Sequence, residues 1–119
     1  MSSPVEYLRY MRDEIAFLER RSAGESKREF DGDETLQRAF VRSLEVIGEA
    51  VKHLPADFRA GHPTVDWRAI AGMRDRLIHD YLGVDYDLVW DAVMTEAPGL
   101  RKQLEAIFEH ETSSEDVQN

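Results

Sequence analysis

The chain has 119 residues, of which 42% are hydrophobic and 33% are charged. These proportions are ordinary for one globular domain and do not indicate wholesale disorder. No apolar run reaches the ~20 residues that a membrane-spanning helix needs, and residues 1–4 lack the regions of a secretory signal, so we expect a cytoplasmic protein without membrane contact. Because the chain has no cysteine, disulfides, thiolate nucleophiles and cysteine-based zinc sites are excluded.

The formal net charge of −9 at pH 7 argues against a broad electrostatic grip on nucleic acid, which usually rests on a surface rich in Lys and Arg. Acidic residues are concentrated in two segments, 85–96 and 109–116. Around Arg68, Arg74 and Arg76 the local charge is close to neutral. Any contact with nucleic acid is therefore expected to be local.

The first half of the chain predicts two helices. Apolar residues at spacings of three and four indicate a helix over 5–21, and the polar segment 22–32, with two glycines, indicates a loop. Asp33 can cap a second helix, whose regular apolar stripe runs over 36–54 and ends before a proline. Within this stripe Gly48 replaces a side chain, which predicts close approach of another helix.

A connection and a third helix follow. Residues 55–63 contain two prolines and a glycine, which are typical of a connecting segment. Thr64 or Asp66 can then cap a helix that begins near Trp67 and ends by Gly83.

Asp85 can start a fourth helix, and Pro98 either kinks it or begins a fifth. The side chains expected to face inward from the fourth helix are Leu88, Val89, Ala92 and Val93. Residues 112–119 are acidic and without periodicity, which predicts a flexible tail. The fold expected is therefore all-α, an antiparallel bundle of four or five helices over residues 1–111.

The third predicted helix contains an anomaly. Projected on a regular helix, Arg74 and Tyr81 fall in the middle of the apolar arc, which consists of Ile70, Ala71, Met73, Leu77 and Ile78. A guanidinium there incurs a large desolvation cost unless it is paired or opens onto a cleft or a second subunit. The alternative is that Arg74 reaches the surface or pairs with an internal carboxylate such as Glu49.

His79 follows Arg74 by five positions, which is about 140° around an ideal helix. The two side chains can therefore act on one substrate only if the helix unwinds near its end, or if copies from two subunits line a shared groove. The alternative for His79 is a structural pair with Asp75, four positions earlier on the same helix face.

The pattern of Arg74, four residues, His79, one residue and Tyr81 resembles the signature of HepT-like proteins, which belong to the HEPN superfamily of helical ribonucleases. The resemblance covers roughly residues 5–110, and its further context lies at 44–50, 67–73, 83–85 and Trp90. Members of the superfamily often have a polar residue such as Asn where this chain has Asp75. That carboxylate could orient His79 or weaken the attraction for phosphate.

The resemblance implies a homodimer in which both copies of the motif line a cleft, and RNA is cleaved there without a metal or another cofactor. Histidine exchanges a proton near neutral pH, so His79 could take the proton from a ribose 2′-hydroxyl or return one to the leaving oxygen. Arg74 would stabilise negative charge on the phosphate. The four histidines show no i,i+4 pair or other ligand spacing, so no metal site is predicted.

The resemblance also implies that Tyr81 is adenylylated by a partner nucleotidyltransferase antitoxin, which would make this chain the toxin of a type II toxin–antitoxin pair. An adenylyl group beside Arg74 would engage the guanidinium and fill the cleft. The alternative is that Tyr81 is an aromatic residue at a helix end without a functional role.

Two other functions stay open at this point. The chain could be a non-catalytic helical module that docks a nucleotidyltransferase or binds a nucleotide in the dimer cleft, and the acidic net charge favours this modestly. It could also be a helical bundle in which Arg74 forms an internal ion pair, in which case Arg74→Met should be tolerated or should stabilise the fold.

Overall fold

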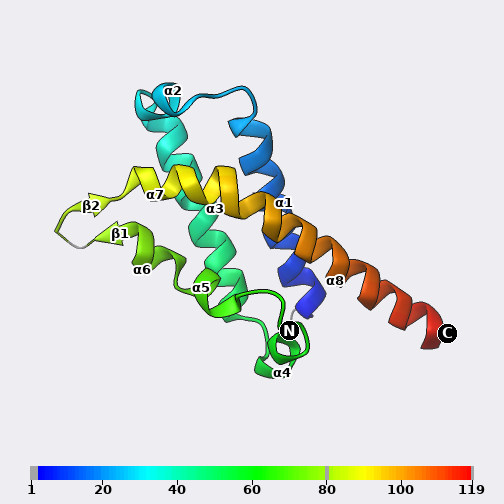
Figure 1. Cartoon of the computed structure of the whole chain (residues 1–119). Coiled ribbons are helices and arrows are strands. Elements are labelled where there is room, and N and C mark those ends of the chain that lie inside the picture. The colour runs from blue at the N-terminus through cyan, green and yellow to red at the C-terminus, as the bar shows by residue number, and fades with distance from the viewer. Residues whose placement is uncertain (1–2, 80, 119) are drawn as a thin grey trace.

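The computed structural model describes residues 3–79 and 81–118, with side chains described as far as Glu111 (Figure 1). Its three long helices are α1 (Pro4–Ser22), α3 (Glu34–Lys52) and α8 (Ala97–Gln118). The short elements are α2 (Lys27–Asp31), α4 (Ala56–Ala60), α5 (Trp67–Ala71), α6 (Met73–Leu77), β1 (Ile78–His79), β2 (Gly83–Val84), α7 (Tyr86–Asp91) and the π-helix η1 (Ala92–Glu96). The predicted all-α bundle is confirmed.

The core lies between the long helices. Helix α1 buries one stripe against α3 and α8, and the buried residues of α3 form the centre of the bundle. The largest fully buried side chains are Leu8, Met11, Ile15 and Leu18 of α1, Phe30 of α2, Phe40, Ile47 and Val51 of α3, Leu77 of α6, Val89, Val93 and Leu104. Burial of these side chains, at ~1.5–3 kcal/mol each, is the main stabilising contribution to the fold.

Helix starts follow the predicted caps. The side-chain oxygens of Asp33, Asp66 and Asp85 accept backbone N–H groups at the starts of α3, α5 and α7 at 3.0, 3.1 and 3.2 Å. Each cap satisfies a donor that the first helical turn leaves without a partner.

Two segments predicted as loops contain short helices, α2 within 22–32 and α4 within 55–63. In the first, the Ser26 hydroxyl oxygen accepts the backbone N–H of Glu29 at 3.1 Å, and the hydroxyl donates to the Glu29 carboxylate at 3.1 Å. This arrangement uses the Ser-x-x-Glu spacing of a helix start. The loop prediction is wrong there because Gly24 and Gly32 lie outside α2 and do not interrupt it.

The third predicted helix, from Trp67 to Gly83, is also wrong in its extent. The helix is interrupted at Gly72, between α5 and α6, and α6 ends at Leu77. Because Gly72 starts a new short helix, side-chain directions projected from Trp67 do not hold beyond it. The residues after Leu77 form an antiparallel hairpin instead, in which Ile78 pairs with Val84 and His79 with Gly83.

Helix α7, η1 and α8 form one continuous rod in Figure 1, and the junction residues Ala92 and Ala97 keep right-handed helical angles. Pro98 therefore lies in the first turn of a helix, which a proline tolerates. Of the four residues expected to face inward, Val89, Ala92 and Val93 are buried. Leu88 is 37% exposed, because it is rotated by about 100° from Val89 around the helix.

The acidic end of the chain, for which a flexible tail was predicted, is helical as far as Gln118. The flexibility predicted for this segment, and with it the domain boundary at residue 111, stays a prediction, and Asn119 lies outside the described residues. Over the described part of the chain, no helix combines the length and apolarity needed to cross a bilayer.

Gly48 allows α5 to approach α3 closely, as predicted. A methyl group placed on Gly48 would lie 3.0 Å from the carbonyl oxygen of Ile70 in α5. That oxygen belongs to the backbone, so it cannot move aside as a flexible side chain would. The close approach fixes the position of α5 against α3.

We expect Gly48→Ala to destabilise the protein by about 1 kcal/mol. The alanine gains up to about 1 kcal/mol in helix propensity, but crowding against a backbone oxygen costs about 1–3 kcal/mol. The matched control is Gly99→Ala in α8, where an added methyl group meets nothing within 4 Å and the propensity gain should appear alone. Chemical unfolding monitored by circular dichroism measures both variants, and two changes of the same sign would contradict the close approach.

Candidate active site

The predicted motif lies where α6 gives way to the β1–β2 hairpin. Leu77 is buried and is the last residue of α6. Ile78 then adopts extended angles, with φ −116° and ψ 120°, and the backbone N–H of Asp85 donates to the carbonyl of Leu77 at 2.7 Å. The chain thus unwinds between Arg74 and His79, one of the two conditions under which both side chains could act on one substrate.

The hairpin turn depends on Gly83. Its φ of +79° lies in the left-handed region that glycine adopts without steric cost. The backbone N–H of Leu82 donates to the carbonyl of His79 at 3.2 Å, which closes the turn. As Figure 1 shows, the hairpin projects away from the long helices. Tyr81 and Leu82, which lie in its turn, are presented to solvent.

Arg74 is exposed and does not lie on a buried face. Its side chain is 59% exposed, and its Nε lies 3.8 Å from a carboxylate oxygen of Glu45 in α3. Glu49, the partner considered from the sequence, pairs with Lys52 at 3.1 Å instead. The buried-arc prediction and the pair with Glu49 are wrong, because the helix break at Gly72 turns α6 relative to α5. The alternative that Arg74 reaches the surface is confirmed.

His79 lies on β1 and is exposed. Together with Asp75, Ile78, Tyr81 and Leu82 it lines a shallow hollow of about 450 Å³. The helical pair of His79 with Asp75 is wrong, because His79 is not on a helix and no hydrogen bond or ion pair joins these two described residues. A supporting role for Asp75 stays a prediction, favoured by its place in the same hollow.

Tyr81 is 100% exposed and Leu82 is 86% exposed. Both lie in the turn between β1 and β2 rather than at a helix end. The structure thus brings Asp75, His79 and Tyr81 to one hollow. Arg74 precedes Asp75 on α6 and is not among the residues that line this hollow.

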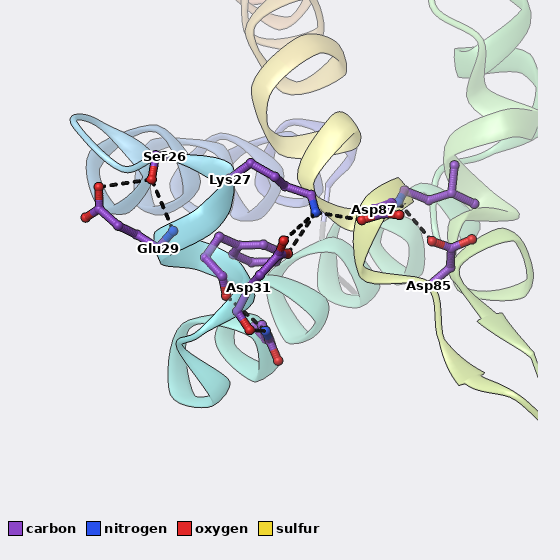
Figure 2. Close-up of polar contacts among 9 residues, drawn as sticks. Ser26, Lys27, Glu29, Asp31, Asp85 and Asp87 are labelled. Atoms are coloured by element: carbon purple, nitrogen blue, oxygen red, sulfur yellow. Dashed lines mark hydrogen bonds and ion pairs between the residues drawn. The ribbon is translucent and has the colours of Figure 1, made fainter.

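A second hollow of about 380 Å³ adjoins His79 and includes two carboxylates, Asp85 and Asp87. Figure 2 shows that Lys27 of α2 forms an ion pair with one of them, Asp87. The Lys27 ammonium lies 2.8 Å from Asp31 and 2.6 Å from Asp87 of α7. The hydrogen bond to Asp31 is the main cause that raises the pKa of Lys27, and the bond to Asp87 adds to it. Lys27 was missed from the sequence because its segment was predicted as a loop.

No group of three or more histidine and carboxylate side chains lies close enough to hold a metal ion within the described residues. The absence of a metal from the reaction stays a prediction that needs an assay.

Lys27→Met tests the tie between α2 and α7 through its pH dependence. Since the pKa of Lys27 is raised, the ammonium stabilises the folded state at every pH below the ordinary lysine value of about 10.4, and the stabilisation is lost as the pH rises through the raised pKa. We expect a lower Tm for the variant at pH 7 and a smaller difference from wild type above the raised pKa. Lys52→Met, which breaks a pair within α3, is the control, and an equal Tm loss at both pH values for Lys27→Met would contradict the assignment.

The fold and the motif define a small helical domain of the HEPN class, whose arginine and histidine, five positions apart, lie at a helix-to-hairpin transition. The family described as Ribonuclease HepT-like matches residues 11–107 of the chain. The chain belongs to this HepT-like ribonuclease family.

Relatives of similar length support the assignment. A protein of Caldanaerobacter subterraneus named as an RNase is 50% identical over 111 residues, which are 93% of this chain and 99% of the relative. A Thermococcus cleftensis protein named ribonuclease HepT is 38% identical over 102 residues, 86% of this chain and 93% of its own. Both names mark the activity as provisional. No solved structure matches the chain at a significant level.

Proposed function

We propose that the chain is a metal-independent endoribonuclease and the toxin of a type II toxin–antitoxin pair, with Arg74 and His79 as its catalytic residues. The observation that carries the proposal is the end of α6 at Leu77. Because the chain leaves the helix between Arg74 and His79, the two exposed side chains are released from the angular separation of a regular helix. The ribonuclease names of the relatives support the same reaction class.

The reaction can be written with the groups of the chain and the RNA alone. His79 takes the proton from a ribose 2′-hydroxyl, and the 2′-oxygen attacks the adjacent phosphorus. The bond from phosphorus to the 5′-oxygen breaks, and the protonated histidine returns its proton to that oxygen. The products are a 2′,3′-cyclic phosphate and a free 5′-hydroxyl.

Arg74 is suited to hold the phosphate. A guanidinium can donate to two phosphate oxygens at once and stabilise the charge that builds in the transition state. The 3.8 Å contact with Glu45 is long for a charge-assisted hydrogen bond, and exposed pairs of this kind contribute little. An incoming phosphate can therefore replace Glu45 as the partner of Arg74.

The homodimer is part of this proposal. The hollow that contains His79 is shallow, and the adjacent Leu82 is largely exposed. An exposed leucine at a hairpin tip is an apolar surface that a second copy could cover. Two copies that meet there would deepen the hollow into a groove lined by both motifs.

We expect the purified, unmodified protein to cleave RNA in the presence of a chelator and His79→Ala to lower kcat by about 10²–10⁴, the usual contribution of proton transfer by a side chain. Arg74→Ala should also lose cleavage, through the lost charge on the phosphate. Gel analysis of a labelled RNA measures the rates, and the cyclic phosphate end identifies the reaction. His110→Ala, which removes an exposed histidine of α8, is the control. Cleavage that requires a divalent metal would contradict the mechanism.

Tyr81 is proposed as the site that a partner nucleotidyltransferase antitoxin adenylylates. Its full exposure supports access by a second enzyme. The phenol oxygen would attack the α-phosphorus of ATP and release pyrophosphate, and the new phosphodiester would then compete with RNA for Arg74. Modification and complex formation would both silence the toxin.

Intact-mass measurement after incubation with the nucleotidyltransferase and ATP tests this modification. We expect wild-type protein to gain one adenylyl group and to lose RNA cleavage, whereas Tyr81→Phe gains none and stays active. Tyr10→Phe removes another exposed tyrosine, on α1, and should behave as wild type. A mass gain in Tyr81→Phe would place the modification elsewhere.

A second candidate is a non-catalytic module that docks the nucleotidyltransferase or binds a nucleotide in the dimer cleft. The two carboxylates beside His79 and the net charge of −9 favour the docking role, because both oppose the approach of RNA phosphates. In this case His79→Ala should leave growth inhibition in cells unchanged.

A further inference from the structure

Helix α6 carries Arg74 but is held weakly by its own packing. It has five residues, begins directly after Gly72, and buries only Met73 and Leu77. The three residues between them are exposed. Two buried side chains on one turn are a small apolar anchor, so contacts outside the core contribute to the orientation of this helix.

Arg76 supplies a contact of this kind. Its Nη1 and Nη2 donate to the two carboxylate oxygens of Glu96, twenty residues later, at 3.1 and 2.7 Å. Nη2 also lies 3.0 Å from the sulfur of Met73. A bidentate arginine–carboxylate pair fixes orientation as well as distance. The single 3.8 Å contact between Arg74 and Glu45 fixes neither.

The π-helix η1 places Glu96 where Arg76 can reach it. In an uninterrupted α-helix, Glu96 would follow Val89 by seven residues and Ala92 by four, and would share their buried face. The wider turn, closed by a hydrogen bond from the Ala97 N–H to the Ala92 carbonyl, shifts the register. Glu96 is instead 44% exposed. Such turns are rare and frequently mark functional positions.

The ion pair lies at the edge of a cavity of about 390 Å³ between α5, α6 and the start of α8. The residues that line it include the apolar side chains of Ile15, Ile47 and Leu100. Close packing in this region is therefore incomplete, and the Arg76–Glu96 pair bridges α6 to η1 across it. Arg76 shares α6 with Arg74, and β1 with His79 follows α6 directly, so a shift of α6 would move both residues.

From this geometry we infer that Arg76 and Glu96 are positioning residues for the ribonuclease reaction, a strap that holds α6 and the hairpin in the orientation that cleavage requires. The inference rests on the proposed function. The guanidinium of Arg76 is engaged by Glu96, so Arg76 acts through the placement of Arg74 and His79 rather than by binding phosphate.

The experiment compares RNA cleavage by Arg76→Met, Glu96→Gln and the charge swap Arg76→Glu/Glu96→Arg with wild type. Misplacement of catalytic groups by about 1 Å can cost ~10²-fold in rate. We expect each single variant to lower kcat by about 10- to 100-fold with little change in KM, and the swap to restore most of the rate. Arg38→Met, which breaks an exposed arginine–carboxylate pair on α3, should leave kcat unchanged.

A direct role of Arg76 in binding RNA predicts a different pattern. Arg76→Met would then raise KM, Glu96→Gln would leave activity unchanged or increase it, and the swap would not rescue it. Any of these results would overturn the strap.

Amide NMR shifts of Ile78, His79 and Gly83 give a readout that does not depend on activity. We expect them to change in Arg76→Met and Glu96→Gln but not in Arg38→Met, and unchanged shifts in the first two would overturn the strap. Normal cleavage by His79→Ala would instead overturn the proposed function. The NMR comparison would then be the test of whether the Arg76–Glu96 pair orients the hairpin.

Discussion

The backbone N–H of Asp85 donates to the carbonyl of Leu77 at 2.7 Å, and this hydrogen bond closes the base of the hairpin that carries His79 and Tyr81. Leu77 is anchored in the core, so the bond ties the hairpin to the bundle at the point where the helix stops. A helix that continued to Gly83 would keep Arg74 and His79 on different faces. The interruption leaves Arg74 on α6 and His79 on β1, both with exposed side chains, and presents Tyr81 in the turn.

The charge distribution explains how a chain with an acidic net charge can contact an RNA phosphate. Two cations near the motif are already engaged by carboxylates, Lys27 by Asp31 and Asp87 and Arg76 by Glu96. Arg74 has only its long contact with Glu45. Within α6, Arg74 is therefore the weakly engaged guanidinium that can meet phosphate, which fits a brief local contact at the cleaved bond better than a long bound RNA.

Much of the fold could be predicted from the sequence because local signals and packing agree. The apolar stripes of α1 and α3, the caps Asp33, Asp66 and Asp85, and the close approach at Gly48 were all confirmed. The roles of Arg74, His79 and Tyr81 stay predictions, and the geometry that the structure gives them was not predicted. The projection of side-chain directions around a helix assumes that the helix is unbroken. Gly72 was the one local signal of the interruption in this segment. The ion pairs of Lys27 and Arg76 join residues distant in sequence, and the second depends on a π-turn that periodicity does not reveal.

The central claim is that Arg74 and His79 serve one phosphate. NMR titration with an RNA fragment whose cleavage-site ribose lacks the 2′-hydroxyl tests it directly, because this ligand binds but cannot be cut. The account predicts that the guanidinium signal of Arg74 and the imidazole signals of His79 shift together along one binding curve. Saturation of one side chain while the other stays unaffected, or two separate binding curves, would contradict it.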